Sequence, residues 1–153
     1  MYDKEKLDKD SEDVKEYIES NREKAPQFME RYDSYELDKE VETKLKCHSD
    51  KYTIYAFSAE WCPDCHKQIP VLARIQEKTG LKTRILGHLM RDSKNPDKHW
   101  KIPPSPAEVE EFNVIKIPSM YILDNRGNKV GEIIEHPPEG MTLEAAILDI
   151  LEV

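Results

Sequence analysis

The sequence predicts an α/β protein in which a mixed central β-sheet is covered by helices on both faces. From residue 52 onward, apolar segments rich in β-branched and aromatic residues alternate with segments of helical periodicity, in the order β-α-β-α-β-β-α. The first of these strands leads into two cysteines, Cys62 and Cys65, and a helical pattern follows them. A strand that opens a helix through a Cys-x-x-Cys pair is typical of a redox site on an α/β fold.

Length and composition limit the classes of function. A chain of 153 residues forms one domain with a substantial core. The net charge of −8 argues against nucleic acid and anionic membranes as partners. The first residues are charged and carry no apolar segment, and only three cysteines are present, so we expect no secretory signal, no disulfide-stapled fold and a cytoplasmic location.

Residues 1–36 are expected to form a helical extension that packs on a core domain of residues 37–153. Apolar residues at helical spacing predict one helix around residues 14–18, a second over 25–32 and a third that ends near Lys46. A segment of this kind either caps the core or serves as an arm that docks a partner.

The core elements follow from periodicity and turn residues. A buried strand is predicted at 52–58, and a helix at 66–79 contains Pro70 and stops at Gly80. A second strand at 82–90 precedes a proline-rich loop at 93–106 around Trp100. The remaining elements are a short helix at 106–112, a hairpin of strands 119–123 and 129–135, and a final helix at 142–151 capped by Thr142.

The two cysteines carry the chemistry. Cys62 is placed at a helix N-terminus, where unpaired backbone N–H groups and the helix dipole favour a thiolate. Cys65 follows one turn later and can close a disulfide on Cys62, so the pair can exchange two electrons with another disulfide. The competing interpretation is half of a zinc site completed by Cys47 and His48. We expect no metal, because a four-ligand site normally brings a second spaced pair.

Four features in this order resemble the thioredoxin family over residues 37–153. They are the run Ala59-Glu60-Trp61-Cys62 followed by Cys65, the helix proline Pro70, the segment Ile117-Pro118-Ser119 and the Asp-x-x-Gly-x turn at 124–128. A helical N-terminal extension and the stretch around Arg91-Asp92 are similar to a prokaryotic branch of this family. The resemblance implies a thioredoxin fold and a cis peptide bond before Pro118.

The resemblance also implies the roles of the site residues. Cys62 would be the nucleophile and Cys65 the resolving cysteine, with Trp61, Pro63 and Asp64 as supporting residues. Ile117 and Pro118 would pair with an extended substrate segment. The redox-active disulfide Cys62–Cys65 would be the only redox group, so no further cofactor is expected. The expected partners are protein or small-molecule disulfides and a reductant, either a thioredoxin-reductase-type enzyme or a low-molecular-weight thiol.

The sequence departs from the family pattern behind the dithiol. The family usually has a buried aspartate six residues before the first cysteine, where this chain has Ala56, and His88 is the nearest candidate for the lysine that partners it. Asp64 either raises the pKa of the neighbouring thiol, relays the proton of Cys65, or only favours the helix dipole. His66 is either a proton shuttle or an exposed helix residue.

Two further features have alternative interpretations. Cys47 is expected to be a free, partly buried thiol, with a regulatory disulfide as the alternative. The proline-rich loop around Trp100 either forms a lip that narrows substrate choice or is a surface loop packed by its own tryptophan.

The sequence as a whole predicts a cytoplasmic thiol–disulfide oxidoreductase that acts mainly as a reductant. A thioredoxin-fold binding or scaffold module with weak turnover is the alternative that Ala56 favours. A disulfide oxidant or isomerase is the third interpretation.

Overall fold

The protein folds around one mixed five-stranded sheet. The computed structural model describes residues 1–87 and 108–152, and its sheet has the strand order β1-β3-β2-β4-β5. The strands are β1 (Glu12–Asp13), β2 (Tyr52–Phe57), β3 (Thr83–Leu86), β4 (Ser119–Asp124) and β5 (Lys129–Ile134). Strand β2 pairs in parallel with β3, whereas the other three pairings are antiparallel. The predicted mixed sheet is therefore confirmed.

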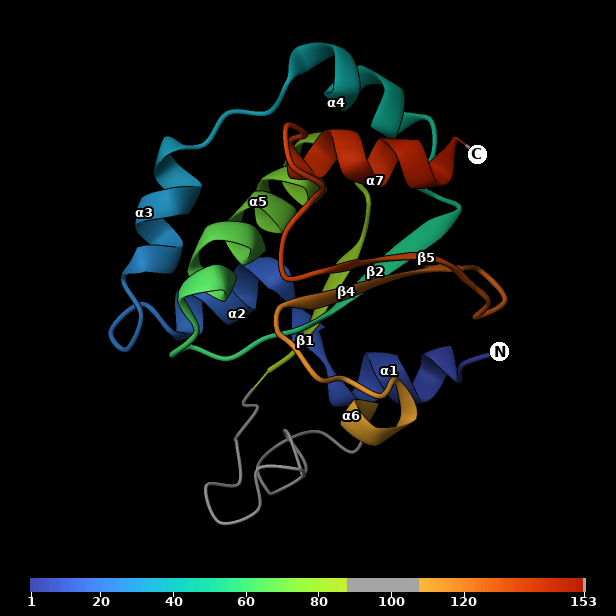
Figure 1. Ribbon diagram of the computed structural model, residues 1–153, viewed down its shortest axis with the longest axis horizontal. Coiled ribbons are helices and arrows are strands. Elements are labelled where there is room, and N and C mark those ends of the chain that lie inside the picture. The colour runs from blue at the N-terminus through green and yellow to red at the C-terminus, as the bar shows by residue number, and fades with distance from the viewer. Residues whose placement is uncertain (88–107, 153) are drawn as a thin grey trace.

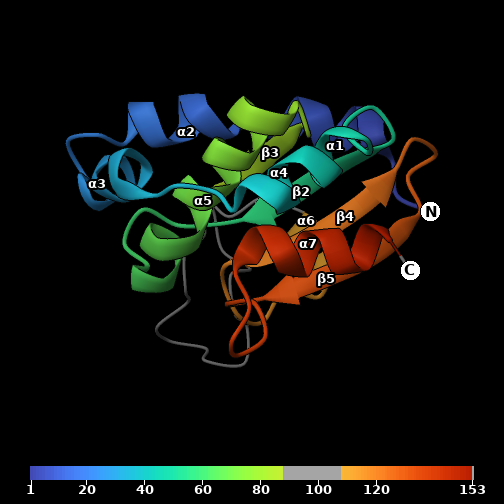
Figure 2. The same cartoon turned by 90° about the horizontal axis from the view of Figure 1, so that it is seen from above.

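Helices cover both faces of this sheet, as Figures 1 and 2 show. The described helices are α1 (Lys4–Asp10), α2 (Val14–Ser20), α3 (Gln27–Ser34), α4 (Lys39–Lys46), α5 (Pro63–Thr79), α6 (Glu108–Glu111) and α7 (Leu143–Leu151). Helices α5 and α7 lie over one face, and α1 and α6 lie on the other side (Figure 1). Tyr55 and Phe57 are two residues apart on β2 and so share the face that α1 and α6 cover. The Tyr55 hydroxyl donates to Asp8 of α1, and Phe57 contacts the ring of Phe112, the residue after α6.

The ends of the two core helices agree with the predicted caps. The Thr142 hydroxyl accepts a hydrogen bond from the Ala145 N–H at 3.2 Å, and Gly80 ends α5 in a left-handed conformation with φ of 81°. Helix α5 begins at Pro63, three residues before the predicted start at residue 66. Pro63 and Asp64 in this first turn are exposed, so the turn lacks the apolar periodicity that marks the helix from residue 66 onward.

The N-terminal segment contributes a strand that the sequence did not predict. In β1, Glu12 lies opposite Ile85 and Asp13 opposite Arg84. A strand of two residues has no periodicity that a pattern could reveal. The same segment contains α1, which the sequence indicated only as part of a generally helical region. Residues 12 and 13 therefore extend the sheet by one strand at its β3 edge.

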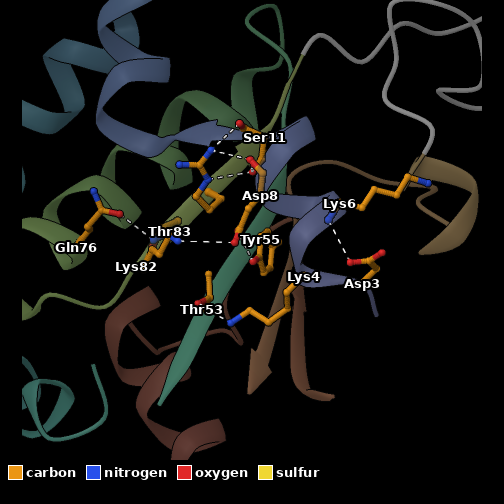
Figure 3. A network of polar contacts seen from close by, with 11 residues as sticks. Asp3, Lys4, Lys6, Asp8, Ser11, Thr53, Tyr55, Gln76, Lys82 and Thr83 are labelled. Carbon is orange, nitrogen blue, oxygen red and sulfur yellow. Dashed lines mark hydrogen bonds and ion pairs between the residues drawn. The ribbon is translucent and has the colours of Figure 1, made fainter. Parts of the chain in front are cut away.

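Polar contacts hold α1 against the sheet, and Figure 3 shows them at close range. The guanidinium of Arg84 donates to the Ser11 hydroxyl at 3.0 Å and to the carbonyls of Asp8 and Ser11 at 3.0 and 2.6 Å. Tyr55 donates to the Asp8 carboxylate at 2.6 Å. The Nζ of Lys82 lies 3.9 Å from a carboxylate oxygen of Asp8 (Figure 3).

The segment between α3 and α4 is held by a buried acid on α7. The Glu144 carboxylate accepts hydrogen bonds from the Tyr35 hydroxyl at 2.7 Å and from the Asp38 N–H at 3.0 Å. Helices α2, α3 and α4 all contact α5. The N-terminal helices therefore pack against the core helix α5.

Some sequence predictions fall outside the described residues. They are the loop at 93–106 with Trp100, the position of His88 and the end of the strand predicted at 82–90. The described part of that strand ends at Leu86. No helix within residues 1–87 or 108–152 has the length and apolar character needed to cross a bilayer.

Candidate active site

Cys62 is the N-cap residue of α5. Its backbone is extended, with φ of −88° and ψ of 117°, and its Sγ accepts a hydrogen bond from the Cys65 N–H at 3.4 Å. The fixed φ of Pro63 suits the first helical position, where a missing N–H removes no helical hydrogen bond. The turn that starts the helix thus directs backbone donors at the sulfur.

These donors change the acidity of Cys62. The pKa of its thiol is lowered from about 9 to about 7, chiefly by the hydrogen bond from the Cys65 thiol and also by the N–H groups of Cys65 and Asp64. Burial and the negative charge of the Asp64 carboxylate act in the opposite direction. A large fraction of Cys62 is therefore a thiolate near neutral pH.

Cys65 has the opposite character. Its side chain is fully buried, and this burial, followed by the interaction with Cys62, raises the pKa of its thiol well above the ordinary value. Hydrogen bonds from the Ser58 hydroxyl and the Ala59 N–H oppose the increase. The two thiols therefore differ in acidity: the pKa is lowered at Cys62 and raised at Cys65.

The predicted cis-proline segment lies beside Cys62. The Ile117–Pro118 peptide bond is cis, as expected. The Cys62 thiol is 3.7 Å from the Ile117 carbonyl oxygen, while the Pro118 carbonyl accepts a hydrogen bond from the Glu135 N–H at 2.6 Å. Residues from two separate parts of the chain therefore meet at the sulfur.

The other supporting residues lie at the surface around this sulfur. Trp61 is 46% exposed, and Pro63 and Asp64 are exposed. An exposed tryptophan next to Cys62 suits a contact surface better than a core position. His66 is half-buried: its Nε2 hydrogen-bonds the Glu60 carbonyl at 2.6 Å, and its ring packs edge-on against Phe28.

Cys47 requires a correction, because it is exposed rather than partly buried. It follows the last residue of α4, two positions after the buried Leu45, which turns it to the opposite side of the helix axis. Ser49 follows two residues later, and its Cβ would lie 3.6 Å from a Cβ placed on Gly80. Gly80 ends α5 at the opposite end from Cys62. Because 17 helical residues rise about 25 Å, Cys47 does not belong to the dithiol site.

No group of three or more potential metal ligands of the His, Cys, Asp or Glu type occurs among the residues for which the structure gives positions.

Two hydroxyl groups behind Cys65 were missed as site residues. The Tyr17 hydroxyl of α2 lies 3.0 Å from the Ser58 Oγ, and the interaction of the Ser58 hydroxyl with Cys65 acts to lower the pKa of the Cys65 thiol. In the sequence, Tyr17 is one of the apolar positions at helical spacing in the helix predicted around residues 14–18. The available signal was Ser58, which lies two residues after Ala56 and so on the same face of the strand.

A reactive dithiol at a helix N-terminus, beside a cis-proline on a mixed sheet, defines a redox-type site on an α/β fold. A family model described as thioredoxin matches residues 11–147, so the chain belongs to the thioredoxin family. No match is found among curated proteins.

Two solved structures are similar to this chain over nearly their whole length. A protein of unknown function from Pseudomonas aeruginosa has 20% identity and a TM-score of 0.68, with 99% of this chain and 98% of that chain covered. An HIV epitope scaffold has 20% identity and a TM-score of 0.66, with 96% of each chain covered. At these identities the likeness concerns the fold alone.

Proposed function

We propose that this protein is a thiol–disulfide oxidoreductase that acts mainly as a reductant of protein or small-molecule disulfides. One observation carries the proposal: the two thiols of the Cys-x-x-Cys pair differ in acidity, with a lowered pKa at Cys62 and a raised pKa at Cys65. A dithiol used for exchange needs one thiolate to attack first and one thiol held in reserve.

In the proposed reaction, the Cys62 thiolate attacks a substrate disulfide and displaces one substrate thiolate, which leaves Cys62 in a mixed disulfide. Cys65 then loses its proton and attacks the Cys62 sulfur. The Cys62–Cys65 disulfide forms, and the second substrate thiolate leaves and takes up a proton. Two electrons have passed from the protein to the substrate, and the dithiol itself is the redox group.

The surroundings of Cys62 suit a substrate chain. Ile117 and Pro118 would align an extended segment by short backbone pairing, and the exposed face of Trp61 would contact its side chains. Asp64 would adjust the acidity of the attacking thiol. A thioredoxin-reductase-type flavoenzyme or a low-molecular-weight thiol would return the two electrons. The exposed thiol of Cys47 fits a reducing compartment, and we place the protein in the cytoplasm.

The midpoint potential of the cysteine pair tests this function. Trp61 fluorescence or thiol trapping would follow the pair across a graded dithiothreitol series, in a Cys47→Ser background. A two-electron transition near the thioredoxin value of roughly −270 mV is expected for a reductant. A value near roughly −180 mV would indicate an isomerase or oxidant instead. A Cys65→Ser variant, which has no intramolecular partner for Cys62, is the control that must show no transition.

A binding module with weak turnover is a second candidate, and the absence of the family carboxylate at Ala56 favours it. Insulin reduction by dithiothreitol separates the two. A reductase accelerates insulin precipitation, and its Cys62→Ser variant does not. Equal rates with and without the protein would favour the binding module.

A further inference from the structure

Behind the resolving cysteine, hydroxyl groups occupy the region where the thioredoxin family usually places a carboxylate. Ala56 is fully buried and lies opposite Ile85 and Met120 in the sheet. Ser58 lies two residues after Ala56 and so on the same face, and the pairing with β3 still reaches it, because its N–H donates to the Leu86 carbonyl at 3.1 Å. Ser58 is fully buried, so its hydroxyl needs partners within the protein.

Ser58 bridges two groups that come from different parts of the chain. Its Oγ lies 3.0 Å from the hydroxyl of Tyr17 on one side, and on the other its hydroxyl acts on the thiol of Cys65, where it lowers the pKa. All three side chains have no exposed surface. A buried hydroxyl without a partner is costly, and here each hydroxyl is satisfied by the next.

The fold makes room for Tyr17 at this place. A Cβ on Gly87 would lie 2.6 Å from Tyr17 Cε1, so only a glycine there allows the ring to lie against the end of β3. The ring also packs edge-on against Phe28 at 5.5 Å, and the Tyr17 carbonyl accepts a hydrogen bond from the Asn21 side chain at 2.8 Å. These contacts hold the hydroxyl in one position.

The direction of the hydrogen bonds follows from the chemistry of the groups. The Cys65 thiol donates to Cys62 when Cys62 is a thiolate, and this hydrogen bond is the main cause of the lowered pKa of Cys62. The Cys65 sulfur is then free to accept from Ser58, and the Ser58 oxygen to accept from Tyr17. Each donor in such a chain polarises the next, which strengthens the hydrogen bond at the end.

We propose that Ser58 and Tyr17 form a buried hydroxyl pair that stabilises the developing thiolate of Cys65 and so accelerates the resolving step. This inference rests on the proposed function. Ser58 contacts the reacting sulfur and is the catalytic residue of the pair, whereas Tyr17 acts through Ser58 and is a positioning residue.

The step needs no protein group beyond those already named. Cys65 first loses its proton to water, its sulfur then forms the new bond to Cys62 Sγ, and the bond between Cys62 and the substrate sulfur breaks as the second substrate thiolate leaves. The hydroxyls only donate hydrogen bonds and return unchanged. The aspartate usual in the family could accept a proton, but a hydroxyl pair instead lowers the energy of the thiolate after the proton has left.

Other ionisable groups face this site and affect its pH dependence. Cys62 faces Cys65 from the start of α5, and Asp64 and His66 flank Cys65 in the same helix. Glu60 and Glu12 act on Tyr17 from the loop before α5 and from β1. One carboxylate oxygen of Glu60 is buried without a hydrogen-bond partner among the described residues. None of these acids is changed in the test, so their contribution is common to every variant.

The test follows the two exchange steps separately. In a Cys47→Ser background, the reduced protein is mixed in a stopped-flow instrument with the aromatic disulfide dithiobis(nitrobenzoate). Attack by Cys62 releases a first coloured thiolate, and attack by Cys65 on the mixed disulfide releases a second.

We expect Ser58→Ala to slow the second release by about tenfold and to move its pH midpoint up by about one unit, because a hydrogen bond to a charged sulfur is lost. Tyr17→Phe removes only the outer hydroxyl and should slow the second release by about threefold. In both variants the first release should stay within about threefold of the parent rate, since its nucleophile is Cys62.

Two matched variants distinguish an effect on the exchange step from the general effect of losing a buried hydroxyl group. Tyr55→Phe removes a buried tyrosine hydroxyl on the other face of β2, and Thr83→Val removes a buried hydroxyl on β3. Both should leave the second release at the parent rate. If Ser58→Ala does not fold, Tyr17→Phe carries the test by itself.

The outcomes distinguish this inference from the proposed function. Folded Ser58→Ala and Tyr17→Phe proteins with the parent's second-phase rate and pH midpoint would overturn the hydroxyl pair and leave the oxidoreductase intact. A parent protein that releases no second thiolate would overturn the oxidoreductase, and the role of the pair with it.

Discussion

At the scale of single residues, the site depends on how Cys62 is surrounded. Its acidity results from donors that the chain places by local geometry: the N–H groups of a helix start and the thiol one turn later. The Cys-x-x-Cys spacing is enough to predict this arrangement, because the helix N-terminus fixes where the N–H groups point. The site geometry agrees with that part of the sequence analysis.

Asp64 affects the pKa of the Cys62 thiol in two opposite ways. Its N–H lowers the pKa of Cys62, whereas its carboxylate raises it. Asp64→Asn keeps the N–H and removes the charge, so we expect the pKa of Cys62 to fall by roughly half a unit and its attack at pH 6 to become about twofold faster. Alkylation rates measured from pH 5 to 9 in the Cys47→Ser background give the pKa.

Asp50→Asn, an exposed acid before β2, is the control for general charge effects. The same measurement decides between the interpretations of Asp64. A slower second release with dithiobis(nitrobenzoate) would support a proton relay to Cys65. No change in either the thiol pKa or the turnover would leave only the interaction with the helix dipole.

The residues that the sequence did not reveal are those whose role depends on contacts distant in the chain. Ser58 and Tyr17 are separated by 41 positions, and nothing in their spacing indicates that they share a hydrogen bond. Cys47 was misplaced for a simpler reason. Leu37, Val41 and Leu45 recur every four residues, which indicates the helix that ends at Lys46, but this spacing does not fix where the residue after the helix points.

At the scale of elements, the apolar core segments were predictable and the polar N-terminal contacts were not. Strands β2 and β4 and helix α5 follow from uninterrupted apolar or periodic runs, and they form within a few residues of the predicted limits. Strand β1 consists of two acidic residues, which are unfavourable in strands. It forms because backbone pairing to β3 and the contacts of Arg84 hold it in place.

The hydrogen bonds of Arg84 should stabilise the N-terminal segment against the sheet. Its guanidinium makes three hydrogen bonds to residues 8 and 11, and an ammonium cannot reproduce that planar arrangement. We expect Arg84→Lys to lower the free energy of unfolding by about 1–2 kcal/mol and to speed hydrogen exchange in α1 and β1. Urea unfolding and exchange measured by mass spectrometry check the two effects.

The exposed Arg22→Lys is the matched control and should change neither quantity. Exchange in α1 and β1 that stays at the parent rate in Arg84→Lys would mean that the backbone pairing of β1 with β3, rather than the arginine, anchors this segment.

At the scale of the whole molecule, the N-terminal segment and the dithiol belong to one structure. Helix α2 supplies Tyr17 to the buried side of the site, and β1 extends the sheet beside β3. The region that matches the thioredoxin family begins at residue 11 and so includes both elements. The N-terminal segment, which the sequence predicts to be an extension, therefore contributes a hydroxyl to the buried contacts behind Cys65.

The stability of the whole fold should depend on pH through Glu108 of α6. Burial, and next the carboxyl of Asp10, raise the pKa of Glu108 from 4.5 to about 7. The folded protein therefore holds a proton that the unfolded chain releases, and this stabilisation is complete below about pH 4.5 and is lost as pH rises through about 7. Glu108→Gln keeps the shape without the charge, so at pH 8 we expect it to unfold with a free energy about 1–3 kcal/mol higher than the parent. Urea unfolding from pH 5 to 8 measures the difference, and the exposed Glu111→Gln of the same helix should follow the parent curve. Parallel curves for Glu108→Gln and the parent would show instead that Glu108 titrates alike in the folded and unfolded states.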